Sequence, residues 1–360
     1  MEFEYKKGMG IGGWLTNYKR FNVLPNDKRL ELTIGDYEHF ESYITEWDII
    51  NIKNMGMDHI RLGFDQIVLE EAPFVYRERT MALLENFVSL CQKHGLGVIL
   101  NLHKCIGNYC DIEEETTLFD SEELKSRFIG LWLELENRFK DNENVIFELL
   151  NEVRDVEPDL WNDLAEKAIK AIRRVNNSRK IIIGPTCWNN PNKLDKLRIF
   201  DDENVIYTFH VYDPHEFTHQ RGVLHWKHLY YNRKIEYPGD IEKYREFYRV
   251  VYNNPNAYPH VDRMDIRYIR EIFNPVAEFK RAHPDKDLWC GEFGTIRHAD
   301  KNSRESWMRD VITLLKENDV PYCVWNYLST PNDGNRFSLV DDDTREILSK
   351  NMLDIINGNI

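Results

Sequence analysis

The sequence has no long hydrophobic run. No stretch of its 360 residues approaches the roughly 18 consecutive apolar residues of a membrane-spanning helix. The N-terminal region also lacks a secretory signal, because acidic residues precede the basic ones and no apolar core of about 7–15 residues follows. We therefore expect no membrane partner and a cytoplasmic location, with secretion by another route as the alternative.

Clusters of basic residues are absent as well. Acidic residues outnumber Lys and Arg by 61 to 47, which gives a net charge of -14. A protein with this charge is repelled by the phosphates of nucleic acids and by anionic lipid surfaces. The sequence therefore argues against a nucleic-acid partner, and no feature of it indicates an obligate protein partner.

Cysteine is scarce, with six residues in the chain. Only Cys105 and Cys110 lie close together, and their spacing has no second half that would complete a four-ligand zinc site. Without an export signal, reduced thiols are the expected state. We expect buried or loop thiols here and no metal site.

Short apolar runs recur along the whole chain and indicate buried strands. They are nearly continuous rather than alternating, which is typical of parallel strands covered on both faces. Segments of helical periodicity separate them, and the repeat is roughly 44 residues, which suits eight βα units. The sequence therefore predicts an α/β fold of the (β/α)8 TIM barrel type, with strands at 8–15, 59–64, 97–104, 145–152, 180–188, 204–213, 288–294 and 320–328.

One interval is too long for a simple repeat. Residues 214–265 follow the sixth predicted strand and carry Trp226, several tyrosines and a helical pattern at 240–252. We interpret the chain as one catalytic domain over 1–360 with an inserted cap subdomain at 214–265. The insertion either packs around a small core of its own or walls a substrate cleft, and both can hold together.

The C-terminal ends of the predicted strands carry polar and aromatic residues. Strand ends of a barrel meet at one mouth, so these residues should lie together. They are Arg61, His103, Asn151, Glu152, His210, Tyr212, Glu292 and Trp325. Two carboxylic acids near an aromatic residue suit glycoside hydrolysis, in which one acid protonates the leaving oxygen and the other captures the sugar.

The two glutamates should differ because their neighbours differ. Arg61 and Tyr212 favour the ionised form of Glu292, which then suits a nucleophile. Glu152 follows Asn151 and has His210 as an expected neighbour, a setting in which a carboxyl holds its proton longer and serves as general acid and then base. Glu148, deeper in the same predicted strand as Glu152, is interpreted as a buried and paired core carboxylate.

Six motifs together resemble glycoside hydrolase family 5, the cellulase and mannanase family. They are IRLGF (60–64), LHKCIG (102–107), ELLNE (148–152), FHVYDP (209–214), CGEFG (290–294) and VWNY (324–327). The resemblance covers roughly residues 8 to 345 and is nearest to cellulase-type members without a signal peptide and with an insertion after strand six. It implies a (β/α)8 barrel, a retaining mechanism and no cofactor.

The resemblance also implies a role for each strand-end residue. Glu152 matches the acid/base and Glu292 the nucleophile. Substrate-binding matches are Asn151 at the sugar 2-hydroxyl, Trp325 as the platform under the reacting sugar, Arg61 and Tyr212 orienting the nucleophile, and His103 and His210 contacting the sugar and the acid/base. Trp226, in the insertion, is a further candidate for stacking on sugars.

The substrate is less defined than the reaction. We expect endo-type cleavage of β-1,4 or mixed β-1,3/1,4 glucan chains and oligosaccharides. An exo-acting β-glucosidase, or a β-mannosidase or mannanase acting on imported oligosaccharides, is the alternative. A non-catalytic carbohydrate-binding barrel would be expected to have lost a catalytic glutamate, and both are present.

Overall fold

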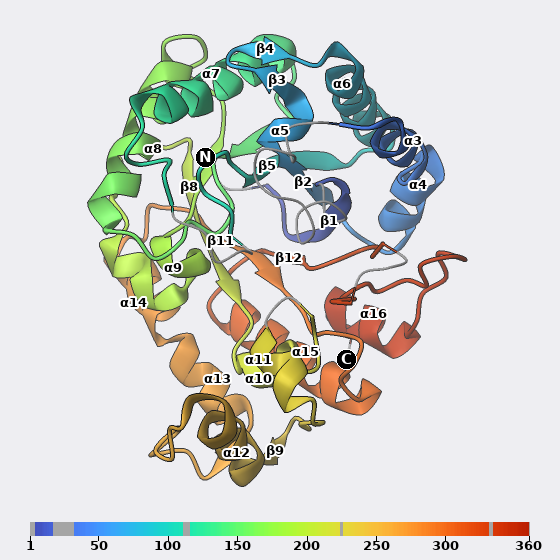
Figure 1. The fold of residues 1–360 in the computed structure, drawn as a ribbon, viewed down its shortest axis with the longest axis vertical. Coiled ribbons are helices and arrows are strands. Elements are labelled where there is room, and N and C mark those ends of the chain that lie inside the picture. The colour runs from blue at the N-terminus through green and yellow to red at the C-terminus, as the bar shows by residue number, and fades with distance from the viewer. Residues whose placement is uncertain (1–3, 17–31, 111–115, 224–225, 331–333, 360) are drawn as a thin grey trace.

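A closed barrel of eight parallel strands forms the centre of the molecule (Figure 1). The computed structural model describes residues 4–16, 32–110, 116–223, 226–330 and 334–359. Around the barrel the strands follow the order β1-β12-β11-β8-β7-β6-β5-β2. Their bounds are β1 Lys7–Leu15, β2 His59–Asp65, β5 Gly97–Lys104, β6 Val145–Glu148, β7 Ile181–Ile183, β8 Val205–Val211, β11 Leu288–Phe293 and β12 Tyr322–Val324. The predicted TIM barrel is confirmed.

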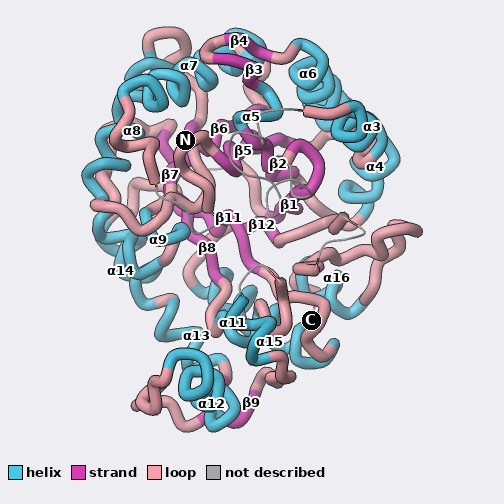
Figure 2. Tube along the Cα trace, in the orientation of Figure 1, coloured by secondary structure: helices cyan, strands magenta, loops and turns pink. Residues whose placement is uncertain are grey.

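Helices surround the strands, as Figure 2 shows. The longer ones are α3 Ile34–Ser42, α4 Glu46–Asn54, α6 Glu78–Lys93, α7 Glu122–Phe139, α8 Pro158–Arg173, α14 Asn274–Ala282, α15 Lys301–Glu317 and α16 Lys350–Asn357. Short elements in the connections are α5 Gln66–Leu69, β3 Glu70–Ala72, β4 Val75–Tyr76, α9 Thr186–Asn189, the 3-10 helix η1 Pro191–Lys196 and α13 Ile266–Ile272. No helix among the described residues is long and apolar enough to cross a membrane.

The helical pattern before β2 is divided between two helices, α3 and α4. Thr45 is the N-cap residue of α4, and its backbone N–H and hydroxyl both donate to Asp48 in the first turn. Such a capping box satisfies amide groups that a helix start leaves without partners.

Two cores stabilise the barrel. Inside it, a layer of apolar side chains fills the end opposite the strand C-termini, consisting of Ile99, Ile146, Ile182, Ile206, Trp289 and Cys323. Between strands and helices lies the larger core, which includes the fully buried Trp132, Trp161 and Trp307. This apolar layer closes the barrel at that end. Polar side chains nearer the C-terminal ends of the strands therefore lie toward the mouth.

Residues 214–265 form a lobe at one end of the molecule (Figure 1). The segment contains α10 His215–Thr218, α11 Trp226–Tyr231, β9 Gly239–Asp240, α12 Ile241–Tyr252 and β10 Arg263–Met264, and β9 pairs antiparallel with β10. Tyr237, Tyr244 and Phe247 are buried within it. These rings belong to the same apolar core that lies between strands and helices, and the Tyr237 hydroxyl donates to Asp310 of α15. The standing of residues 214–265 as a separate subdomain stays a prediction.

Candidate active site

All eight predicted strand-end residues lie at the mouth of the barrel. Arg61, His103, His210 and Glu292 belong to β2, β5, β8 and β11. The other four, Asn151, Glu152, Tyr212 and Trp325, follow β6, β8 and β12 within four residues of the strand end. Parallel strands bring these positions together because all their C-terminal ends point the same way.

The guanidinium of Arg61 is the centre of the hydrogen-bond network. Its Nε and Nη2 donate to the two oxygens of Glu148, at 2.6 and 2.8 Å. Nη1 donates to Glu292 Oε1 at 2.5 Å, and Nη2 also donates to Asn151 Oδ1 at 2.7 Å. Arg61 and Glu148 are both fully buried, so Glu148 is the paired core carboxylate that its sequence position predicts.

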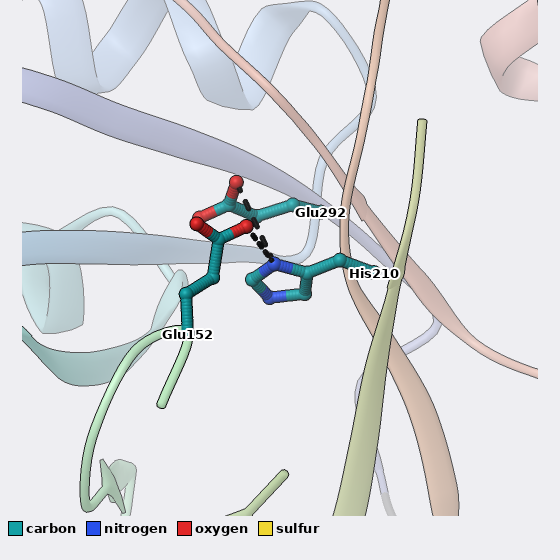
Figure 3. A group of neighbouring side chains, drawn as sticks. All are labelled: Glu152, His210 and Glu292. Atoms are coloured by element: carbon teal, nitrogen blue, oxygen red, sulfur yellow. Dashed lines mark hydrogen bonds and ion pairs between the residues drawn. The ribbon is translucent and has the colours of Figure 1, made fainter. Parts of the chain in front are cut away.

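Glu152 and Glu292 face each other beside the ring of His210 (Figure 3). Nδ1 of His210 lies 2.9 Å from Glu152 Oε1 and 3.8 Å from Glu292 Oε2. One oxygen of each carboxylate and one His210 nitrogen all lie within 4.8 Å of one another. The hydroxyl of Tyr212 donates to Glu292 Oε2 at 2.8 Å, so both oxygens of Glu292 accept a hydrogen bond.

The acidity of Glu292 differs from the expectation. Burial raises its pKa above the ordinary value, and the lowering by His210, Arg61 and Tyr212 only partly offsets this. Desolvation penalises a buried charge, and here it outweighs the favourable neighbours. Arg61 and Tyr212 therefore stabilise the ionised form of Glu292, but they do not fully offset the cost of burying its charge.

Glu152 stands on a turn rather than in a strand. The strand β6 ends at Glu148, although the apolar pattern predicts a strand as far as 152. Glu152 has a φ of 44°, a left-handed conformation that is uncommon outside glycine. Its side chain is 20% exposed, whereas that of Glu292 is 6% exposed. On this turn the carboxyl of Glu152 is more exposed to solvent than that of Glu292.

His103 and Trp325 form a flat wall of the mouth. Their rings are stacked with 5.4 Å between centroids and an interplanar angle of 6°. Burial, with Arg61 next in importance, holds the pKa of His103 well below its usual value, so the ring is neutral. A Cβ on Gly10 would lie 2.7 Å from the Trp325 ring, so a glycine in β1 makes room for this platform.

Trp226 is placed differently from the other candidates. It begins α11 and is 58% exposed, and its ring packs against Tyr230 and Lys227 of the same helix. Trp47 of α4 is also exposed.

Two residues of the site were not predicted from the sequence. The Nδ2 of Asn189, at the end of α9, lies 3.1 Å from His210 Nε2. The Nδ2 of Asn151 lies 3.6 Å from Sγ of Cys110, which belongs to the close cysteine pair. Asn189 follows the fifth apolar run in a polar stretch, and that stretch carries no motif that would single it out.

Glu152, His210 and Glu292 are also the one group of described residues with metal-ligand spacing. However, Arg61 and Tyr212 hydrogen-bond to the two oxygens of Glu292, and Asn189 occupies the second nitrogen of His210. A guanidinium in contact with a carboxylate supplies the positive charge that a cation would otherwise bring. The donor set therefore suits two carboxylates that act directly on a substrate.

Comparison with known proteins identifies the family. Residues 26–330 match the family described as Cellulase (glycosyl hydrolase family 5). Endoglucanase C of Acetivibrio thermocellus is 35% identical over 332 residues, which cover 90% of this chain and 91% of that protein. Cellodextrinase A of Ruminococcus flavefaciens is 27% identical, with coverage of 87% and 83%. Thermotoga maritima Cel5A in complex with cellobiose has a TM-score of 0.73 at 25% identity, with coverage of 98% and 97%. The chain therefore belongs to glycoside hydrolase family 5, as its motifs predict.

Proposed function

We propose that this chain is a retaining endo-β-1,4-glucanase in which Glu292 is the nucleophile and Glu152 the acid/base. The observation that carries the proposal is that oxygens of the two carboxylates lie within 4.8 Å of each other. Retaining glycosidases have carboxyl groups about 5–5.5 Å apart, whereas inverting ones leave about 6.5–9.5 Å for a water molecule. The spacing therefore favours two successive displacements at the anomeric carbon.

In the first displacement Glu292 is ionised and Glu152 is protonated, and in the second Glu152 is ionised. First, an oxygen of Glu292 bonds to the anomeric carbon while Glu152 gives its proton to the departing glycosidic oxygen. Glu152, now ionised, then takes a proton from water, whose oxygen displaces Glu292. Arg61 and Tyr212 donate hydrogen bonds that stabilise the negative charge of Glu292 before the first step and again after the second.

The names of the similar proteins support a β-1,4-glucan substrate. One is an endoglucanase, one a cellodextrinase, and Cel5A is described with bound cellobiose. We infer that the chain cleaves β-1,4-linked glucan chains and their soluble oligosaccharides internally. Mixed-linkage glucan, mannan and attack from a chain end are the other outcomes of a substrate panel.

Product analysis tests the proposed function. We expect cellopentaose and soluble β-1,4-glucan to give mixtures of shorter oligosaccharides early, and proton NMR to show the first-formed product as the β-anomer. Early release of glucose or cellobiose alone would indicate exo-type action. An α-anomer formed first would contradict the assignment of Glu292 and Glu152.

The two glutamates should fail in different ways when they are replaced. Glu292→Ala should abolish turnover for every leaving group, because no covalent intermediate forms. Glu152→Ala should keep more of the first step on dinitrophenyl cellobioside, whose leaving group needs little protonation, and azide should accelerate turnover and give a β-glycosyl azide. Equal losses in both variants without an azide response would show that the roles are assigned wrongly.

Tyr212→Phe tests the ionisation of the nucleophile. Glu292 reacts in its ionised form, so activity is present above its pKa and is lost as the pH falls. Burial already raises that pKa, and the phenol of Tyr212 lowers it. The variant should therefore move the acidic limb of kcat/KM upward by about 0.5–1 pH unit. Tyr207→Phe, in β8 and away from the carboxylates, should leave the limb in place. An acidic limb that does not move in Tyr212→Phe would contradict this role of the phenol.

Trp226→Ala tests whether the exposed aromatic residue of the insertion binds sugar. If it does, KM for cellotetraose should rise roughly 2- to 10-fold while KM for an aryl glucoside changes less, since one good aromatic contact is worth about 0.5–1.5 kcal/mol. Trp47→Ala is the matched control, because it removes an equally exposed tryptophan from α4. Equal KM values in both folded variants would restrict Trp226 to a structural role.

A further inference from the structure

The imidazole of His210 lies between the two carboxylates and a buried amide. Its Nδ1 is 2.9 Å from Glu152 Oε1, and its Nε2 is 3.1 Å from Nδ2 of Asn189. Asn189 is fully buried at the end of α9 and touches neither carboxylate in the contacts described above. The Asn189 amide therefore reaches the carboxylates through His210.

The backbone around Asn189 is held in an unusual conformation. Cys187, Trp188 and Asn189 have φ values of 58°, 58° and 54°, and left-handed residues of this kind cost of order 1 kcal/mol or more each. The N–H groups of Cys187 and Trp188 donate to the carbonyls of Arg154 and Val153, directly after Glu152. The two loops that carry Glu152 and Asn189 therefore hold each other in place.

The packing around the amide also fits it specifically. A Cβ on Gly184 would lie 2.5 Å from Oδ1 and 2.8 Å from Nδ2 of Asn189, so the glycine leaves the space that the amide occupies. Oδ1 is buried and has no hydrogen-bond partner among the described residues. A buried acceptor without a partner costs stability, so stability does not account for an amide at this position.

The donor at Asn189 determines which nitrogen of His210 carries the proton. Burial lowers the pKa of His210 to about 4, so the ring is neutral and has a single N–H. An amide Nδ2 can only donate, and the nitrogen that accepts its hydrogen bond cannot carry the proton. The proton is then on Nδ1, directed at Glu152.

We propose that Asn189 is a positioning residue that fixes His210 in the Nδ1–H tautomer, so that the ring donates a hydrogen bond to Glu152 throughout the reaction. The proposal rests on the proposed role of Glu152 as acid/base. A fixed donor stabilises the ionised carboxylate and thereby sets the pH at which Glu152 changes from acid to base. Asn189 acts through the ring and contacts no substrate atom in this role.

Other charged and titratable groups surround His210 and must stay constant in the test. They come from β2, β5, β6, β8 and β11 and their ends, and they are Arg61, His103, Glu148, Glu152, Tyr212 and Glu292. Asn189 is uncharged, so replacing it by another uncharged residue leaves the sum of these charges unchanged. A shift in the pH profile then reports the lost hydrogen bond.

Two variants remove the amide from His210 in different ways. Asn189→Gly deletes the side chain and tolerates the positive φ, while Gly184→Ala pushes the intact amide aside. The matched control is Asn162→Ala in α8, a buried asparagine whose side chain, within the described part of the chain, hydrogen-bonds to the backbone of Lys196 and Arg198. All three should be compared as folded proteins by circular dichroism and thermal unfolding.

The expected signature is a paired shift. Activity on the basic side of the kcat/KM profile requires protonated Glu152. On dinitrophenyl cellobioside the second step limits the rate, so activity on the acidic side of the kcat profile requires ionised Glu152. In Asn189→Gly and Gly184→Ala both limbs should move upward by about one pH unit, the size of a lost hydrogen bond to a charged group. Asn162→Ala should move neither, and limbs that stay in place or move singly in the folded variants would overturn the proposal.

The tautomer can be read without any substrate. In enzyme labelled with 15N-histidine, with His210 assigned from His210→Gln, the wild type should show the proton on Nδ1 and Asn189→Gly a mixture of tautomers. A proton on Nε2 in the wild type would overturn the proposal. If no β-glucan is cleaved, the proposed function fails on its own, while this measurement still decides the role of Asn189.

Discussion

A buried guanidinium holds the mouth of this barrel together. Arg61 contacts Glu148, Glu292 and Asn151 at once and is fully buried. Removing such charges from water costs several kcal/mol per ion, so a network of this kind is weak evidence for stability. Its effect is positional: it fixes one oxygen of Glu292 and, through the amide of Asn151, the turn on which Glu152 stands.

The fold makes two chemically identical residues different. Glu292 projects from a barrel strand, is nearly covered and has both oxygens bound, whereas Glu152 follows a short strand on a left-handed turn and is more exposed. The turn is braced from the next loop by hydrogen bonds from Cys187 and Trp188. His210 lies between the two environments, and the amide behind it connects that brace to the reacting groups.

The aromatic richness of the sequence has two structural explanations. At the mouth, His103 and Trp325 form a stacked platform. In the insertion, Tyr237, Tyr244 and Phe247 are buried in the apolar core that also lies between strands and helices, whereas Trp226 on α11 is exposed. Burial therefore assigns these three rings of the insertion to packing.

The sequence by itself determined the barrel and the eight residues of its mouth. Buried parallel strands need nearly continuous apolar runs, and the residue that ends each run must lie at the common edge, so both follow from local pattern. Tertiary structure alone decided where β6 ends, which way burial moves the pKa of Glu292, that Asn189 meets His210, and which tryptophans are exposed. Each of these depends on desolvation or on contact between segments far apart in the chain. Such effects arise only when the strands have closed, so no local pattern in the sequence records them.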